Sequence, residues 1–326
     1  MPEIVSSCPL CNSPASQLFD QRPFRPAETP AAVGCTAAVG CTALLVVNRL
    51  CLACGFVYQS PRMTEAEQAA FYAGEYRRLY QGQETPTPKD LAVQKRRAEL
   101  TAAWCRPYLQ NSNPPYPICT HLDIGCSAGV LLQTFQTVYA TKPTGVEPGD
   151  MYRAYAQSLG LPIYPSLESL PAGTEENLIS LMHVLEHLSH PVEYLCDLRQ
   201  KYLSPNGWLL IEVPNLYAHD CFEPAHLTSF SPHTLRQALT RAGYRILAFK
   251  AHGMPRSQLI PLYLTILARP DPTAALHYSP LATCHFPLFG VGAEHFVRWR
   301  RRWGFFHRRV VTRLFPSRAW IPPQAS

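Results

Sequence analysis

The chain has 326 residues, enough for one large domain and a smaller one, and 47% of them are hydrophobic while 16% are charged. No run of eighteen apolar residues occurs, which argues against a membrane-spanning helix, and the first residues lack the pattern of a signal peptide. We therefore expect a cytoplasmic protein whose twelve cysteines are thiols or metal ligands. The net charge of +6 comes from the C-terminus, because residues 295–326 contain eight arginines and no Lys, Asp or Glu.

Two Cys-x-x-Cys pairs mark the N-terminal segment, residues 1–62. Four thiolates suit a tetrahedral zinc ion and leave no open position, so such a zinc would be structural. The spacer of 39 residues is long for this motif, and an immediate repeat of Ala-Ala-Val-Gly-Cys-Thr at 31–42 accounts for part of the excess. The sequence predicts a zinc-ribbon-like segment, with reduced cysteines that bind no metal as the alternative. The ligands would be Cys8, Cys11, Cys51 and Cys54.

Residues 63–112 read as a helical cap. Thr64 and Glu67 form a capping box that starts one helix, and a second helix is expected from about 89 to 108. The second helix carries its large apolar residues on one side, and the first leads into tyrosines that either line a substrate cleft or pack within the cap. These residues are Val93, Leu100, Trp104, Tyr72 and Tyr76. Residues 111–117 are a linker by composition.

A strand, a glycine turn and a helix follow one another between 118 and 135. The apolar run ends at Asp123, the turn contains Gly125 and Gly129, and a helical pattern follows. This is the first unit of an open α/β sheet, in which ligands bind beyond the carboxyl ends of the strands. Glu147 ends the next short strand, 24 residues after Asp123, where an acid accepts the ribose hydroxyls of a nucleotide.

A third motif follows the buried strand 178–182 and reads His183-Val-Leu-Glu186-His187. This spacing also occurs in zinc peptidases, but there the cluster lies within one helix, whereas here it directly follows a strand. A helix and the strand 208–213 come next. We therefore place His183 directly after a buried strand.

Asp123-x-Gly125-x-x-x-Gly129, together with the motif at His183 and the Pro-Asn-Gly-Trp-Leu-Leu-Ile-Glu-Val run at 205–213, resembles class I S-adenosylmethionine (SAM)-dependent methyltransferases. The resemblance covers residues 118–268. It implies a Rossmann-like, seven-stranded doubly wound α/β sheet with the last strand antiparallel, in a domain at 113–270. It also implies that SAM is the cofactor. The cofactor-binding residues would be Asp123, Gly125, Cys126, Gly129, Glu147, Pro148 and His183.

His226 precedes a Phe-Ser-Pro helix start, as in methyltransferases that carry an N-terminal zinc ribbon, among them deoxysugar C-methyltransferases. The resemblance implies that His226, and secondly His183, are the catalytic residues, and that the acceptor is a small molecule or glycan. Those relatives have an acid before this histidine, where this chain has Ala225. The difference weakens the case for C-methylation and leaves O-methylation open.

Residues 271–326 form a Pro-rich linker and a basic tail. From 294 to 315, arginines alternate with Trp and Phe, which is typical of an amphipathic helix that binds a membrane surface or a polyanion. A helix docked on the body of the protein fits the pattern equally well.

Three other functions compete with this interpretation. A dinucleotide-dependent oxidoreductase would need a third glycine in the turn. A non-catalytic zinc-ribbon and Rossmann-like binding protein is disfavoured by the intact acids and glycines. A nucleic-acid or protein methyltransferase would suit the basic tail, but the Asn-Pro-Pro-Tyr at 113–116 precedes the first strand instead of following the fourth.

Overall fold

The computed structural model describes residues 2–24, 44–71, 85–110, 118–271, 273 and 292–322. Several sequence features lie outside these residues: the repeat at 31–42, Tyr72 and Tyr76, the linker at 111–117 and most of the Pro-rich linker after 271. Within the described residues, no helix is both long and apolar enough to cross a membrane.

Seven strands form the central sheet in the order β10-β11-β8-β7-β4-β5-β6, and β11 runs antiparallel to both of its neighbours. This arrangement confirms the predicted Rossmann-like sheet. The strands are β4 (Thr120–Ile124), β5 (Lys142–Val146), β6 (Ile163–Tyr164), β7 (Glu176–Met182), β8 (Leu203–Pro214), β10 (Tyr244–His252) and β11 (Tyr263–Pro270).

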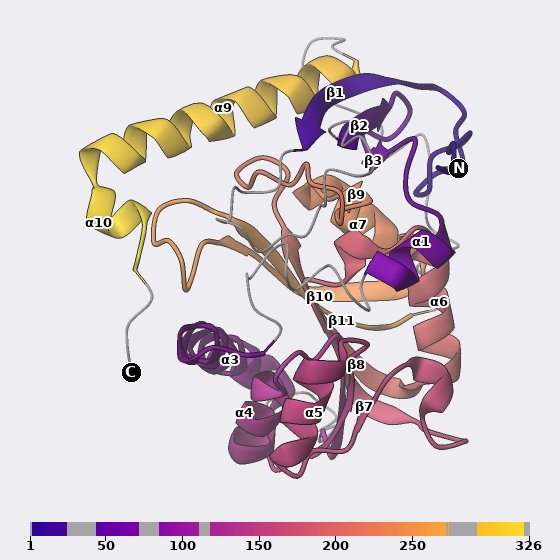
Figure 1. The fold of residues 1–326 in the computed structure, drawn as a ribbon, viewed down its shortest axis with the longest axis vertical. Helices are drawn as coiled ribbons and strands as arrows, with labels where there is room; N and C mark the ends of the chain where they lie inside the picture. Colours follow the sequence, from indigo (N-terminus) through magenta and orange to yellow (C-terminus); the bar gives the residue numbers. More distant parts are fainter. Residues whose placement is uncertain are drawn as a thin grey trace, which may run out of the picture.

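Helices cover both faces of this sheet (Figure 1). On one face α3 (Pro88–Leu109) and α4 (Val130–Tyr139) pack against Leu178 and Leu210, while α5 (Asp150–Ser158) packs against β6. On the other face α6 (Pro191–Lys201) and α7 (Pro232–Arg241) pack against Leu181 and Ile211. Neighbouring strand residues thus point to opposite apolar layers, which explains why β7 and β8 read as continuous apolar runs.

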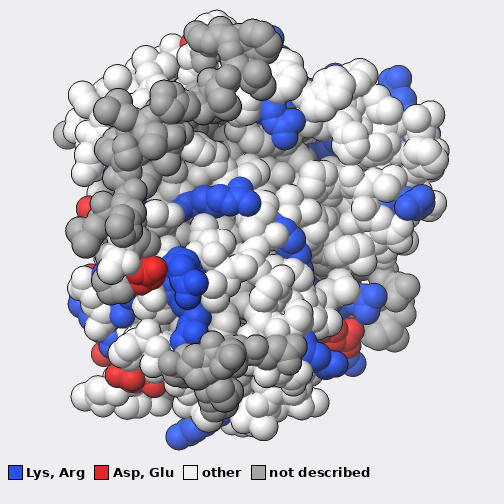
Figure 2. Space-filling view, turned by 180° about the vertical axis from the view of Figure 1, so that it is seen from behind, with Lys and Arg blue, Asp and Glu red and all other residues white. Residues whose placement is uncertain are grey.

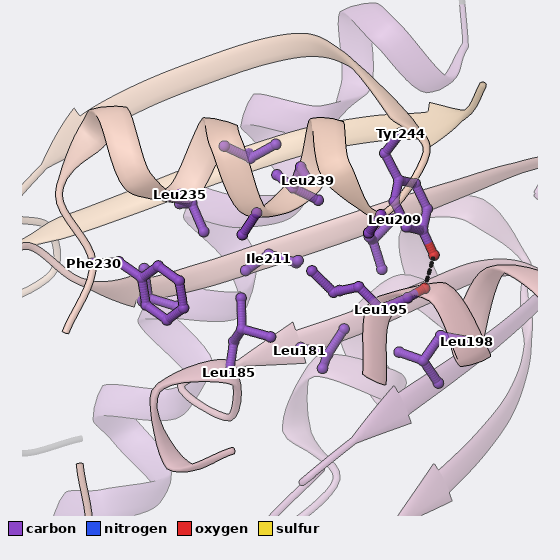
Figure 3. Packing of buried hydrophobic residues seen from close by; sticks show 14 of the residues in the cluster. Leu181, Leu185, Leu195, Leu198, Leu209, Ile211, Phe230, Leu235, Leu239 and Tyr244 are labelled. Carbon is purple, nitrogen blue, oxygen red and sulfur yellow. Dashed lines mark hydrogen bonds between the residues drawn. The ribbon is translucent and has the colours of Figure 1, made fainter. Parts of the chain in front are cut away.

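The layer under α6 and α7 is built from leucines of both helices and of the sheet, closed at one end by Phe230 (Figure 3). At the other end the buried Tyr244 hydroxyl donates a hydrogen bond of 3.0 Å to the carbonyl of Leu195 on α6. This bond satisfies the hydroxyl inside an apolar layer and ties α6 to β10.

Helix starts follow the sequence signals. Thr64 caps α1 (Glu65–Ala70) in a complete capping box with Glu67, as predicted. Ser231 caps α7, and Pro232 occupies the first helical position.

The N-terminal segment is not a separate body. Its sheet has the order β1-β2-β3-β9, and it consists of β1 (Ser16–Phe24), β2 (Leu44–Cys51), β3 (Val57–Gln59) and β9 (Thr228–Ser229). Because β9 lies between β8 and α7 in the chain, the segment expected as a zinc ribbon shares a sheet with the large domain.

The predicted basic helix is α9 (Ala293–Leu314), which is followed by α10 (Pro316–Ala319). Its first part lies beside the N-terminal sheet, and the helix extends from there along the edge of the molecule to α10 (Figure 1). Arginines on its inner side donate to backbone carbonyls of the body, for example Arg298 to Phe19 at 2.9 Å and Arg308 to Ala218 at 3.3 Å. The basic helix is therefore docked on the body through hydrogen bonds that its charged arginines donate.

Candidate active site

A cavity of about 640 Å³ opens at the carboxyl ends of β4, β5 and β7. Its volume is in the range of pockets that hold small ligands or cofactors. Six of the seven residues predicted to bind the cofactor line it: Asp123, Gly125, Cys126, Glu147, Pro148 and His183.

The two glycines of the turn have different roles. Both have left-handed backbone, with φ of +70° at Gly125 and +74° at Gly129. Gly125 lines the cavity, whereas Gly129 does not. A Cβ at Gly129 would lie 2.4 Å from Leu161 Cδ1, so this glycine permits close packing of α4 against the chain before β6.

Asp123 is buried and accepts a hydrogen bond of 2.6 Å from the Ser180 hydroxyl. The Ser180 oxygen lies 2.7 Å from Nε2 of the buried His121. Burial raises the pKa of Asp123 to about 7, and the nearby Glu147 carboxylate adds to the effect. The acid of the turn is therefore anchored by neighbouring strands, which the sequence pattern did not reveal.

The Glu147 carboxylate connects the turns that precede α4 and α5. Its carboxylate accepts the backbone N–H of Ser127, in the turn before α4, at 2.8 Å and that of Gly149, before α5, at 3.0 Å. The side chain is 4% exposed and lines the cavity. Two backbone donors therefore hold the Glu147 carboxylate in a fixed position at the cavity wall.

His183 lies between two buried carboxylates. Its Nδ1 is 3.3 Å from Glu186 Oε1 and its Nε2 is 3.2 Å from Glu212 Oε1. A carboxylate oxygen therefore lies near each ring nitrogen of His183.

Glu212 is the centre of a polar network that sequence reasoning missed. It is fully buried on β8, and its carboxylate also meets His252 at 3.2 Å, Thr265 at 2.8 Å and Arg97 at 3.6 Å. Burial alone would raise the pKa of Glu212, but the hydrogen bonds from the histidines and the arginine charge hold it well below the usual range. An acid within the apolar run Leu-Leu-Ile-Glu-Val was the available signal.

His226 lies behind the cavity wall and not on it, whereas His187 is part of the wall. The two rings are 5.0 Å apart. Nδ1 of His226 donates to the Cys221 carbonyl at 3.1 Å, and Nε2 is 2.8 Å from Glu223 Oε1. Glu223 thus supplies the carboxylate that Ala225 lacks, three residues before the histidine instead of one.

In the cluster of Glu186, His187, Glu223 and His226, burial and neighbouring charges shift the pKa values in opposite directions. Burial lowers the pKa of His187 to about 4. Burial acts in the same direction on His226, but Glu223 outweighs it and raises the pKa of that imidazole. Burial would raise the pKa of Glu186, yet the surrounding histidines hold it at about 2.

The N-terminal sheet holds the loop that carries His226. The Gln59 side chain on β3 donates to the carbonyls of Glu223 and His226, both at 2.7 Å. The buried Arg62 donates to the Ser189 carbonyl at 2.9 Å on the other side of the cluster. The N-terminal segment therefore positions the histidine end of the cavity.

The four predicted metal-ligating cysteines are close together. Their sulfur atoms all lie within 4.8 Å of one another, with 3.7 Å between Cys8 and Cys54 and 3.5 Å between Cys11 and Cys51. Four sulfurs at the Zn–S distance of ~2.3 Å in a tetrahedron are about 3.8 Å apart. The donor set therefore fits a tetrahedral ion.

The chain matches one known protein family and several solved structures. The family model described as "Methyltransferase domain" matches residues 86–248. Among curated proteins, sequence comparison finds no match to the chain.

Solved structures with a similar fold include a SAM-dependent methyltransferase from Archaeoglobus fulgidus, at 22% identity over 55% of this chain and 97% of that chain, with a TM-score of 0.40. Another is a SAM-dependent methyltransferase from Clostridium acetobutylicum, at 11% identity over 55% and 92%, with a TM-score of 0.41. The plantazolicin methyltransferase BpumL in complex with SAH (S-adenosylhomocysteine) matches at 16% identity over 63% and 94%, with a TM-score of 0.45. These likenesses are too distant to carry an argument about ligands or acceptors.

The family match covers half of the chain and includes the glycine turn, Glu147 and the histidine motif. It also spans β4 to β8, the part of the sheet around the cavity. The chain therefore belongs to the methyltransferase domain family.

Proposed function

We propose that the chain transfers a methyl group from SAM to a small-molecule or glycan acceptor. The observation that carries the proposal is one cavity whose wall contains the glycine turn and Glu147 as well as His183 and His187. The glycine turn and Glu147 suit a nucleoside, and His183 and His187 suit a methyl acceptor.

The residues fit SAM by their chemistry. Glu147 presents buried carboxylate oxygens, which can accept hydrogen bonds from both ribose hydroxyls. Gly125 brings backbone to the cavity without a side chain. The guanidinium of Arg97 also lines the cavity, and it can bind the carboxylate of the methionine part.

SAM supplies a methyl group that is already activated by its sulfonium, so the protein's work is to orient the acceptor and handle its proton. Positioning of two reactants can contribute ~7–11 kcal/mol when the geometry is good. We assign the acceptor end to the cluster of Glu186, His187, Glu223 and His226. The Glu223–His226 pair reopens C-methylation, because it provides an acid–histidine pair for an acceptor carbon next to a carbonyl.

We also propose that the four cysteines bind a structural zinc ion, because their four sulfur atoms lie within 4.8 Å of one another. The ion would support the sheet whose Gln59 holds the loop of His226.

The outer face of α9 is proposed to contact an anionic membrane surface. Trp299, Trp303 and Phe306 lie on one side of the helix and are 57%, 53% and 55% exposed. Exposed arginines flank them. Figure 2 shows that, on the face of the molecule drawn there, Lys and Arg side chains outnumber the acidic ones. Aromatic rings among cations suit a lipid interface with negative headgroups.

Calorimetric titration with SAM, SAH and NAD tests the main proposal. Micromolar binding of SAM and SAH without binding of NAD is expected. Failure of the folded, zinc-loaded protein to bind either sulfur nucleotide would refute it and favour a non-catalytic binding protein.

Vesicle sedimentation tests the proposed membrane contact of α9. Vesicles with phosphatidylserine should bind the protein, and Trp303→Ser should weaken binding. Equal binding of both proteins, or binding of nucleic acid alone, would contradict the membrane proposal.

A further inference from the structure

The carboxylate of Glu186 lacks hydrogen-bond partners. Its side chain is 2% exposed, and within the part of the chain that the structure describes neither carboxylate oxygen has a hydrogen-bond partner. His183 Nδ1 approaches Oε1 to 3.3 Å, but outside hydrogen-bond geometry. Burying a carboxylate without hydrogen bonds is costly, and a cation bound beside Glu186 would offset that cost.

Two histidines stand beside this carboxylate. One donor atom from each of Glu186, His187 and His226 can be chosen so that all three lie within 4.8 Å of one another. Donors at ~2.1 Å around one metal ion are at most about 4.2 Å apart, so small side-chain rotations would bring the three into coordination distance.

Both histidines are oriented as metal-binding histidines usually are. His187 Nδ1 donates to the Ala225 carbonyl at 2.8 Å, and His226 Nδ1 donates to the Cys221 carbonyl at 3.1 Å. A backbone carbonyl at Nδ1 fixes the tautomer in which Nε2 can bind a metal. At His226 the Nε2 atom faces the Glu223 carboxylate at 2.8 Å, so metal binding would displace the proton between them. Glu223 Oε1, 2.8 Å from His226 Nε2, is within reach as a fourth ligand.

We propose that Glu186, His187 and His226 form a binding site for a divalent transition-metal ion, separate from the cysteine cluster. Two imidazoles and one or two carboxylates suit Mn²⁺, Fe²⁺, Co²⁺ or Zn²⁺ and differ from the thiolate set at the N-terminus. The N-terminal sheet supports the new site, because Gln59 holds the carbonyls of Glu223 and His226.

The site also narrows the acceptor class to one methylated on oxygen, because His226 as a metal ligand could not serve as the base for C-methylation; this step rests on the proposed function. His187 forms part of the cavity wall, so the ion would sit beside the acceptor end of the cavity. A metal ion binds hydroxyl or carbonyl oxygen and lowers the pKa of a bound hydroxyl. The O–H proton would pass to water, and the acceptor oxygen would form a bond to the methyl carbon of SAM as its C–S bond breaks to give SAH. The acceptor would bear a hydroxyl with a second oxygen nearby for chelation.

Mn²⁺ and Co²⁺ are the probes, because Mn²⁺ prefers oxygen and nitrogen donors and leaves the cysteine cluster to zinc. The zinc-loaded, full-length protein is titrated with each ion, and binding is followed by calorimetry, by the Mn²⁺ electron-paramagnetic-resonance signal and by the thermal midpoint. Glu186→Gln keeps the side-chain shape and removes the charge. Glu176→Gln is the matched control, since Glu176 is also a buried acid but begins β7 at the opposite end of the strand.

We expect one ion per chain in the wild type and in Glu176→Gln, and affinity reduced at least about tenfold in Glu186→Gln, with loss of the thermal shift. Two results would overturn the site: no binding of either ion by protein that binds SAH, or unchanged binding in Glu186→Gln. Binding of the ion with no effect of its removal on methyl transfer would refute the link to the acceptor. Failure to bind SAH would instead count against the proposed function and leave the metal titration to decide the site.

Discussion

Replacement of Glu147 by glutamine tests the cofactor side of the cavity. The carboxylate accepts two backbone N–H groups from different turns, and an amide can accept only one of them while its NH₂ group faces the other. A hydrogen bond to a charged group contributes ~1.5–3 kcal/mol. If the ribose hydroxyls use the same carboxylate, SAH affinity should fall by roughly 10- to 150-fold.

Calorimetry with SAH measures the change, and urea unfolding reports separately on the loss of stability from the backbone bonds. Glu176→Gln is the control, because it neutralises a buried acid at the far end of the sheet and should leave SAH binding unchanged. A folded Glu147→Gln variant whose affinity changes less than about threefold would refute the assignment of Glu147 to the ribose.

Three further predictions concern other parts of the molecule. In Gly304→Ala the new Cβ would clash with the backbone oxygen of Tyr217, so α9 must shift. The free energy of unfolding, measured in urea, should fall by ~1–3 kcal/mol. Gly292→Ala is the control, because nothing lies within 4 Å of its new Cβ, and it should leave stability unchanged. Cys8→Ser should abolish stoichiometric zinc in metal analysis, while Cys119→Ser, at an exposed free thiol, should retain it. Burial raises the folded-state pKa of Asp123 to about 7, so its contribution to stability should fall as pH rises from about 4 to 7. Asp123→Asn should flatten the dependence of the unfolding free energy on pH over this range. An unchanged pH dependence would contradict a raised pKa at Asp123.

The sheet was predictable because its signals are local. Apolar strands, turn glycines and capping residues such as Thr64 and Ser231 lie within a few positions of the elements they control. The second helix shows the limit of this reasoning. Its large residues Leu100 and Trp104 are only partly buried, while Ala98 and Ala102 face α4, because small side chains allow the two helices to pack closely.

The candidate site was predictable only where its parts follow strand ends. The glycine turn and Glu147 obey that rule, and most of the predicted residues meet in one cavity. The sequence did not indicate the roles of Glu212, Glu223 and Gln59, because those roles depend on contacts that form only in the folded chain. The pairing of β3 with β9 is likewise non-local, since no periodicity at 57–59 indicates a partner at 228–229.

A crystal structure of the protein with SAH tests the central claim most directly. The account predicts SAH in the cavity, with its ribose hydroxyls on Glu147, its sulfur beside the turn at Gly125 and its position open toward His187. SAH bound elsewhere, or bound in the cavity with its sulfur turned away from His183 and His187, would contradict methyl transfer at this site.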